Sequence, residues 1–393
     1  MNRKTYLLED ENSIRDTFKY ICKNLKIYIY PFTPGGTANL RAFLDTALYD
    51  KEHECGETYK AWAYFLDRLI HSPIYTNNPD EADLFLVPHW EPHNRGQAYH
   101  NDLIRPLQKA ITSDPYIKTF PKRNHLFIYI SDNTSLSERR IPQDIRDHLK
   151  KRFIRLSYSG RDYDWGQYHL DEICKKKHFD PQNEIVIPPG IPVQSRGYRN
   201  PERNCKYDFF YKGSLHPPKR QLERFNFLKY VTSIAELSED NDSYFGIHCA
   251  GWGIWTARLY NYLNLSIIPI ISSDGVILPF ESFLDYRSFT IKLLSTTYAE
   301  NNRDPHPILH LQDVARTARM KTSKLGKEKK MVVKRLYQMQ DNTKSASYWL
   351  DWLSKDEFRN PFCLIAIELF GFIDERYKRS NLNPVSRSEF FRI

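Results

Sequence analysis

The chain has 393 residues and a formal net charge of +9; 41% of its residues are hydrophobic and 14% are aromatic. This composition predicts two or three folded domains and excludes a wholly disordered or collagen-like chain. The longest uncharged apolar stretch, Tyr262 to Ile271, is too short to span a bilayer, which requires about 20 apolar residues. The sequence therefore predicts no membrane segment.

The amino terminus and the cysteines indicate the cellular compartment in which the protein is expected. No apolar signal or anchor core follows Met1. The six cysteines are widely spaced and form no Cys-x-x-Cys pair, which is typical of reduced thiols and not of a zinc site or a disulfide framework. These features predict a cytoplasmic protein without a bound metal.

Basic residues gather in several clusters, of which Lys327 to Arg335 is the longest. Most clusters lie in segments with helical patterning, where a solvated charged face is the ordinary explanation. No arginine-rich arm or zinc-finger spacing accompanies them. No nucleic-acid partner is expected.

Taken in chain order, the first segment, 1–25, is polar and predicts a frayed helix. Apolar runs and helical patterns then alternate, which is typical of a Rossmann-like sheet of parallel strands. The predicted strands lie at 26–30, 84–87, 125–130 and 185–187, with helices at about 57–72, 100–112 and 141–152. A stiff stretch, Pro188 to Pro192, ends this N-terminal lobe, which we place at 26–192.

The same alternation begins again after the prolines and predicts a C-terminal lobe over 193–320. Its strands are expected at 207–211, 244–248 and 267–271, and its helices at 220–231 and 257–263. The remainder, 321–393, is expected to contain helices, within a helical region at 312–370, and a loose tail. In such a pair of lobes, ligands bind in the cleft at the carboxyl ends of the strands.

The segment from His248 to Asn261 carries the clearest chemical signal. A strand ends, Gly253 frees the backbone, and Thr256 is suited to cap the next helix. The exposed N–H groups of a helix start form an anion site, and Arg258 can add a bidentate contact to a phosphate. The alternative is an ordinary strand–helix turn whose arginine makes a surface ion pair.

The next strand ends in Ser273 and Asp274, two polar side chains at the same edge. Together with the preceding segment, this region resembles the exostosin family, glycosyltransferase family 47. The matching pieces in the C-terminal lobe are 256–259, 268–271, Asp274, 278–280 and 284–286, and those in the N-terminal lobe are 26–30, 79–88, 124–127 and 187–189, followed by 209–213 with Arg220. The resemblance covers about 26–290.

Two departures from the family pattern stand out. Asn261 occupies the place of a glutamate that holds the nucleotide ribose, and an amide lacks the charge-assisted strength of a carboxylate. Ser266 and Ile267 replace a Gly-Cys pair. The identity of the donor, and activity itself, depend on how the site accommodates these changes.

The resemblance implies a GT-B fold, in which two Rossmann-like lobes face each other and the second holds the sugar nucleotide. It also implies inverting, metal-independent transfer of a hexosyl, pentosyl or glucuronosyl group from a UDP-linked donor, with no cofactor. The residues expected to contact this substrate are Lys212, Gly213, Arg220, Gly253, Trp255, Thr256, Arg258, Asn261, Ser273 and Asp274. The acceptor is expected to be a glycan or glycoprotein.

The catalytic base is expected in the first lobe. His89 and Asp132 each follow a predicted strand, and either side chain could take the proton of the acceptor hydroxyl. Two Asp-x-Asp triplets, at 162–164 and 240–242, are the form used by metal-dependent glycosyltransferases, but neither follows a clear buried strand, so solvated loops are favoured. His248 and Cys249 have no further ligand at useful spacing, which favours a buried strand end.

Three functions remain open from the sequence. The first is the glycosyltransferase, expected in the cytoplasm, with a large DNA virus as one possible source, or in the Golgi if an anchor precedes this sequence. The second is a catalytically inactive carbohydrate-binding or scaffold protein with the same fold, which Asn261 would favour. The third and weakest is a basic nucleic-acid binder, which the spread of the charge along the chain disfavours.

Overall fold

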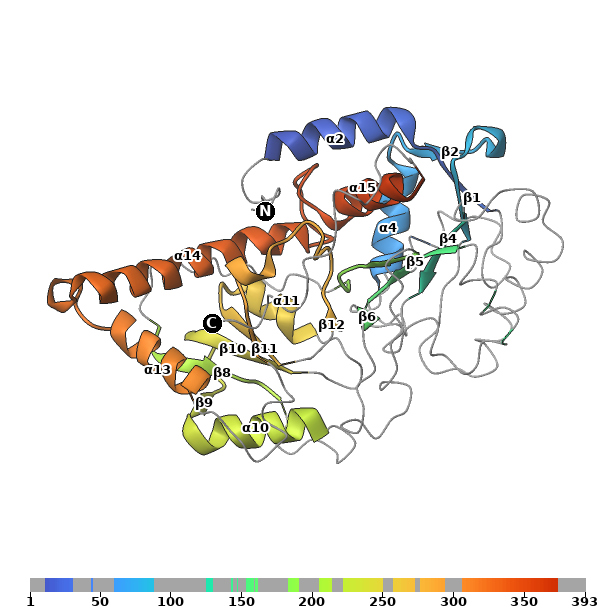
Figure 1. Cartoon of the computed structure of the whole chain (residues 1–393). Helices are drawn as coiled ribbons and strands as arrows, with labels where there is room; N and C mark the ends of the chain where they lie inside the picture. The colour runs from blue at the N-terminus through green and yellow to red at the C-terminus, as the bar shows by residue number, and fades with distance from the viewer. Residues whose placement is uncertain are drawn as a thin grey trace.

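The computed structural model describes residues 11–30, 44, 60–87, 125–129, 143, 147, 153–158, 160–161, 183–190, 205–213, 222–249, 257–272, 276–293 and 306–373. These residues form two lobes, each built on a sheet whose strands are all parallel (Figure 1). The prediction of two Rossmann-like α/β lobes is confirmed.

The N-terminal lobe contains a six-stranded sheet in the order β2-β1-β3-β4-β5-β7. The strands are β1 (Ile27–Ile29), β2 (Tyr75–Thr76), β3 (Leu84–Val87), β4 (His125–Tyr129), β5 (Phe153–Ser157) and β7 (Glu184–Val186). Three helices share one apolar core with this sheet: α2 (Glu11–Asn24), α4 (Ala61–Ile70) and α15 (Pro361–Ile373). A 3₁₀ turn at Pro79–Glu81 leads into β3.

The C-terminal lobe contains a five-stranded sheet in the order β13-β11-β10-β8-β9. Its strands are β8 (Tyr207–Phe210), β9 (Leu237–Ser238), β10 (Ser243–Cys249), β11 (Ile268–Ser272) and β13 (Ile291–Leu293). The helices α10 (Leu222–Ile234) and α13 (His306–Ala318) pack with the second apolar core, while α11 (Ala257–Asn264) and α14 (Lys327–Trp349) pack on each other and on β11. In both lobes the second strand lies on one side of the first strand and the later strands on its other side, which is the doubly wound order.

The two lobes are joined at several points. β6 (Gly160–Arg161) of the first lobe pairs antiparallel with β12 (Val276–Ile277) of the second. The link between α14 and α15 is fastened to the first lobe: the Trp352 indole Nε1 donates to the Pro188 carbonyl at 2.8 Å, and Arg68 Nη2 donates to the carbonyls of Trp352 at 3.0 Å and Ser354 at 2.7 Å. Figure 1 shows α14 running from the second lobe toward the first.

Several elements differ from the sequence predictions. The expected frayed helix is the ordered α2, because Ile14, Phe18 and Ile21 are buried against the first core. The predicted helical region at 312–370 is three helices and a 3₁₀ turn at Thr322–Lys324, since Gly326 caps α14 and Pro361 opens α15. β5 and β13 were not predicted. The predicted helix at 100–112, and most of that at 141–152, lie outside the described residues.

The helix α11 packs unusually close to β10. A Cβ atom on Gly246, in the middle of β10, would lie 2.6 to 2.8 Å from three ring atoms of Tyr262 on α11. The Tyr262 hydroxyl donates to the Ile247 carbonyl at 2.8 Å, which holds the ring flat against the strand. Only glycine leaves the space that this ring occupies.

We therefore expect Gly246→Ala to destabilise the protein by about 1–3 kcal/mol, because an added methyl group must displace a packed aromatic ring. Thermal unfolding followed by circular dichroism would measure the fall in Tm. The matched control is Gly326→Ser, since no atom lies within 4 Å of an added Cβ there and serine is a favoured helix cap. An unchanged Tm for Gly246→Ala would contradict this account of the packing.

Candidate donor-binding site

The strand order of the C-terminal sheet locates the candidate site. β8 has β9 on one side and β10 on the other, so the chain winds outward in opposite directions from the gap between β8 and β10. In open parallel sheets, ligands bind beyond the carboxyl ends of the strands at such a reversal. Lys212 and Gly213 follow β8 at this edge, and α11 follows β10.

Arg258 spans this edge. It lies in the first turn of α11 and is half-buried. Its Nε donates to the Lys212 carbonyl at 3.3 Å, and its guanidinium carbon lies 4.9 Å from the centre of the Tyr211 ring, a cation–π distance. The guanidinium is therefore held across the carboxyl edge of β8 and does not extend into bulk solvent.

Three more predicted residues lie around Arg258. A Cβ on Gly213 would stand 2.9 Å from Arg258 Nη2 and 3.1 Å from the Tyr211 hydroxyl, so this position must lack a side chain for the guanidinium to sit where it does. Lys212 is exposed beside it. Asn261 is exposed one helical turn beyond Arg258, on the same side of α11. Among the described residues, two cationic side chains and one amide thus gather at this edge of the sheet.

His248 lies at the end of β10 and is 2% exposed, in register with Ile271 of β11. Its Nδ1 makes no hydrogen bond. Burial, and secondarily the positive charge of Arg258, lower the pKa of His248 to about 3, so the imidazole is neutral. Cys249 is fully buried beside it, and the prediction of a buried strand end is confirmed.

The other predicted site residues lie outside the described part of the chain. They are His89, Asp132, Arg220, Gly253, Trp255, Thr256, Ser273 and Asp274. Of the two Asp-x-Asp triplets, that at 162–164 is also outside. The one at 240–242 forms a turn before β10, in which the amide of Asp242 donates to Asp240 Oδ1 at 2.9 Å. This is the amino end of the strand, opposite to the candidate site.

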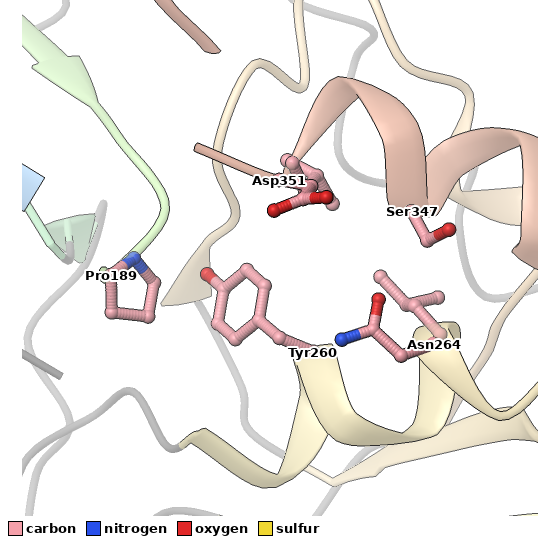
Figure 2. A pocket seen from close by; sticks show the side chains of 7 residues that line it. Pro189, Tyr260, Asn264, Ser347 and Asp351 are labelled. Atoms are coloured by element: carbon pink, nitrogen blue, oxygen red, sulfur yellow. The ribbon is translucent and has the colours of Figure 1, made fainter. Parts of the chain in front are cut away.

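A small cavity lies on the side of α11 away from Arg258, where Tyr260 faces Pro189 of the first lobe and Asp351, which follows α14 (Figure 2). Its volume of about 10 Å³ holds roughly one water molecule. A sugar nucleotide cannot enter it. The cavity marks a junction between the lobes, and the candidate site remains the sheet edge at Arg258.

Within the described residues, no group of three or more His, Cys, Asp and Glu side chains is placed to hold a metal ion. None of the helices in the same part of the chain is long and apolar enough to cross a bilayer.

Four of the six cysteines are described, and all four are free thiols: Cys22, Cys205, Cys249 and Cys363.

A buried charge pair in the N-terminal lobe was missed by sequence reasoning. Arg155 of β5 and Glu184 of β7 have no exposed side-chain surface, and their closest charged atoms are 3.5 Å apart. The Ser157 hydroxyl donates to Glu184 Oε1 at 2.7 Å. Burial of an ion pair is costly unless hydrogen bonds accompany it. The available signal was an arginine inside the apolar run Phe153–Ser157.

Comparison with known proteins identifies the family. The Exostosin GT47 domain matches residues 21–303, most of the chain. The chain belongs to the exostosin GT47 family. It is 24% identical over 300 residues to a probable glucuronosyltransferase 47 A of Physcomitrium patens, covering 68% of this chain and 62% of that protein. It is 23% identical over 289 residues to the probable beta-1,4-xylosyltransferase IRX10 of Arabidopsis thaliana, covering 68% of each chain.

The predicted resemblance to the GT47 family is thus confirmed, and with it a GT-B arrangement of two parallel-sheet lobes. A third relative, the probable glucuronoxylan glucuronosyltransferase IRX7 of Arabidopsis thaliana, is 24% identical over 301 residues, or 67% of this chain and 62% of that protein.

Some family motif residues of this chain serve its core. Leu278, Phe280, Leu284 and Tyr286 are all at most 5% exposed, and the Tyr286 hydroxyl donates to the Pro279 carbonyl at 2.9 Å. Phe280 has a φ of 55°, a left-handed conformation that is rare for a bulky residue. This GT47 segment folds into a compact turn, and the buried Phe280 and Tyr286 side chains are not available to a ligand.

The neutral His248 predicts a pH dependence of stability. Because its pKa is lower in the folded protein than the unfolded value of about 6.5, only the unfolded chain takes up its proton as the pH falls below 6.5. The contribution of the neutral His248 to the free energy of unfolding is thus fully present above pH 6.5 and is lost progressively as the pH falls toward 3. We expect Tm to fall over this range less steeply in His248→Gln than in the unaltered protein.

The control for this measurement is His71→Gln, because His71 is half exposed, at 50% of its side chain, and pairs with Asp67 on the surface of α4. Its Tm-against-pH curve should follow that of the unaltered protein. Equal slopes for the two variants would contradict a buried neutral imidazole at position 248.

The close approach at Gly213 gives a second prediction. In Gly213→Ala the new methyl group would displace the Arg258 guanidinium, a flexible group, so the fold should be retained while anion binding weakens. We expect the Kd for uridine diphosphate to rise about tenfold, equal to about 1.4 kcal/mol. Isothermal titration calorimetry measures it, with Gly326→Ser as control; an unchanged Kd beside a lowered Tm would indicate a purely structural glycine.

Proposed function

We propose that this protein is an inverting glycosyltransferase that moves a sugar from a nucleoside diphosphate, UDP above all, to a hydroxyl of a glycan or glycoprotein. The observation that carries the proposal is the Arg258 guanidinium, held at the strand-order reversal of the C-terminal sheet in a GT47 chain. The names of the relatives, probable glucuronosyl- and xylosyltransferases, favour a glucuronosyl or pentosyl group over a hexosyl group.

The leaving group requires positive charge. As the bond between the sugar C1 and the diphosphate breaks, negative charge gathers on the phosphate oxygens, and preorganised donors at that point lower the barrier. Arg258 would supply two N–H donors and Lys212 an ammonium, with the N–H groups of α11 behind them. Because these protein groups carry the charge, the proposal includes metal-independent transfer with no cofactor.

Asn261 would lie next along the donor. It is exposed one turn from Arg258, where its amide can bond a ribose hydroxyl through either the oxygen or the nitrogen. Of the remaining proposed donor contacts, Gly213 gives the guanidinium its space. Arg220, Gly253, Trp255, Thr256, Ser273 and Asp274 complete the set proposed on sequence grounds alone.

The base is proposed in the first lobe. In its sheet, β1 has β2 on one side and β3 on the other, so the strand order reverses between β1 and β3. In sequence, His89 comes two residues after β3 ends, whereas Asp132 follows β4, one strand farther from the reversal. The topology therefore favours His89 over Asp132 as the group that takes the acceptor proton.

Asn261 also supports a second candidate, a GT-B protein that binds carbohydrate without turnover. A neutral amide holds a ribose hydroxyl less strongly than a carboxylate does. This candidate predicts that sugar nucleotide binds but that no UDP is released in the presence of any acceptor. Asn261→Glu would then raise donor affinity without creating activity.

Substitution of Arg258 tests the main proposal. We expect Arg258→Ala to lower kcat/KM for the donor about 10²–10³-fold, the loss typical when one donor to a developing anion is removed. Arg258→Lys should recover only part of it, because an ammonium cannot bond two phosphate oxygens in a fork. UDP release from a panel of UDP-sugars, with xylan oligosaccharides among the acceptors, measures it.

The control is Arg316→Ala, since Arg316 is 62% exposed on α13 and pairs loosely with Asp313 at 3.5 Å. It should leave kcat/KM unchanged. Transfer that continues at the full rate in Arg258→Ala would remove the proposed donor site.

A further inference from the structure

The turn between α13 and α14 and the first turns of α14, Met320 to Arg335, form a strongly basic segment that we call the basic tip. It contains seven basic residues and one acidic residue, Glu328, and no aromatic residue. The basic residues are Lys321, Lys324, Lys327, Lys329, Lys330, Lys334 and Arg335. The basic tip lies beyond residues 21–303, which the GT47 domain matches.

All seven basic side chains are exposed. Within the described part of the chain, none of them makes an ion pair or a side-chain hydrogen bond. Their charge is therefore not neutralised by any residue that the structure describes. A concentrated field of one sign attracts a partner of the opposite sign.

Large apolar side chains are exposed among these charges. Met331 is 62% exposed, Met320 44% and Val332 39%. On a helix, residues three and four positions apart share a face, so Met331 stands between Lys327 on one side and Lys334 and Arg335 on the other. Of the large hydrophobic side chains that the structure describes as exposed, Met331 is the most exposed, and it occupies the centre of the basic face.

The basic tip is held firmly at the end of the second lobe. Leu336, one turn after Val332, is 3% exposed in the second apolar core, and Leu325 in the turn is 6% exposed. Figure 1 shows α13 and the start of α14 at the end of the molecule away from β1, β2 and α2. The charged and apolar side chains thus project from a fixed base, far from the first lobe.

We propose that the basic tip docks on the surface of an anionic membrane. The lysine ammonium groups would lie against lipid phosphate and carboxylate groups, and Met331, Met320 and Val332 would enter the boundary between head groups and acyl chains. A sequence-independent nucleic-acid surface would use arginine and aromatic stacking side chains, and the basic tip has one arginine and no aromatic residue. The exposed methionine at the centre is the feature that favours lipid.

Vesicle binding of the full chain tests the proposal. In flotation assays we expect binding to vesicles of phosphatidylcholine with about 30% phosphatidylserine, at least tenfold weaker binding to phosphatidylcholine alone, and weakening by salt. The combined variant Lys327→Gln, Lys330→Gln, Lys334→Gln and Arg335→Gln should lower the partition coefficient about tenfold or more. Met331→Ser, which keeps every charge, should lower it about threefold.

The matched control removes the same charge elsewhere: Lys19→Gln, Lys23→Gln, Lys229→Gln and Lys355→Gln, all at exposed positions outside the basic tip. It should bind vesicles like the unaltered protein, and circular dichroism should show all variants folded. No preference for anionic vesicles, or equal losses in both four-residue variants, would overturn the proposal. So would an unaffected Met331→Ser combined with tighter binding to duplex DNA or polyglutamate, which would indicate a purely electrostatic partner.

Discussion

The position of the proposed donor contact depends on how closely α11 lies on β10. Gly246 presents no side chain, so the Tyr262 ring rests directly on the strand and its hydroxyl bonds the Ile247 carbonyl. This contact sets the height of α11 above the sheet. One turn earlier, Arg258 then reaches the Lys212 carbonyl and the face of Tyr211. A packing feature in the middle of the sheet thereby places a charge at its edge.

The opposite face of the same helix belongs to the junction between lobes. Tyr260 is 6% exposed and faces Pro189, and Leu263 joins the apolar core of the first lobe. The link after α14 is bonded to that lobe through Trp352 and Arg68. An eight-residue helix thus carries the proposed donor contact at its start and a contact with the first lobe on its far side.

Most of the parallel strands were predictable because they are buried on both faces and appear as unbroken apolar runs, as in Leu84–Val87 and Ile268–Ser272. β5 was not, because Arg155 interrupts its run and is neutralised by Glu184, which is distant in sequence. β13 was missed because it has only three residues and the middle one is the charged Lys292. The ion-pair partner of Lys292, Glu281, comes from the preceding turn. Periodicity cannot anticipate a buried charge whose counter-charge arrives through tertiary structure.

The candidate site also combines features that the sequence pattern contains with features that depend on tertiary structure. The place of Arg258 at a helix start was predictable, whereas its role as a donor contact stays a prediction. The structure adds what the pattern does not contain: the support of Tyr211, the close approach at Gly213, and the neutral His248 nearby. These depend on which strands become neighbours. The strand order itself could not be derived from the sequence, since the two possible sides of β8 look alike in a linear pattern.

The first and last described helices meet: α2 packs against α15, with Phe18 and Phe362 ring centres 6.4 Å apart. The N-terminal lobe is therefore not closed by its own stretch of chain. During synthesis, the parts of α2 and α4 that pack against α15 stay uncovered by it until residue 373 has left the ribosome. The second core needs only α14 from the later part of the chain, whereas the first core needs α15. The second lobe can therefore be completed before the first.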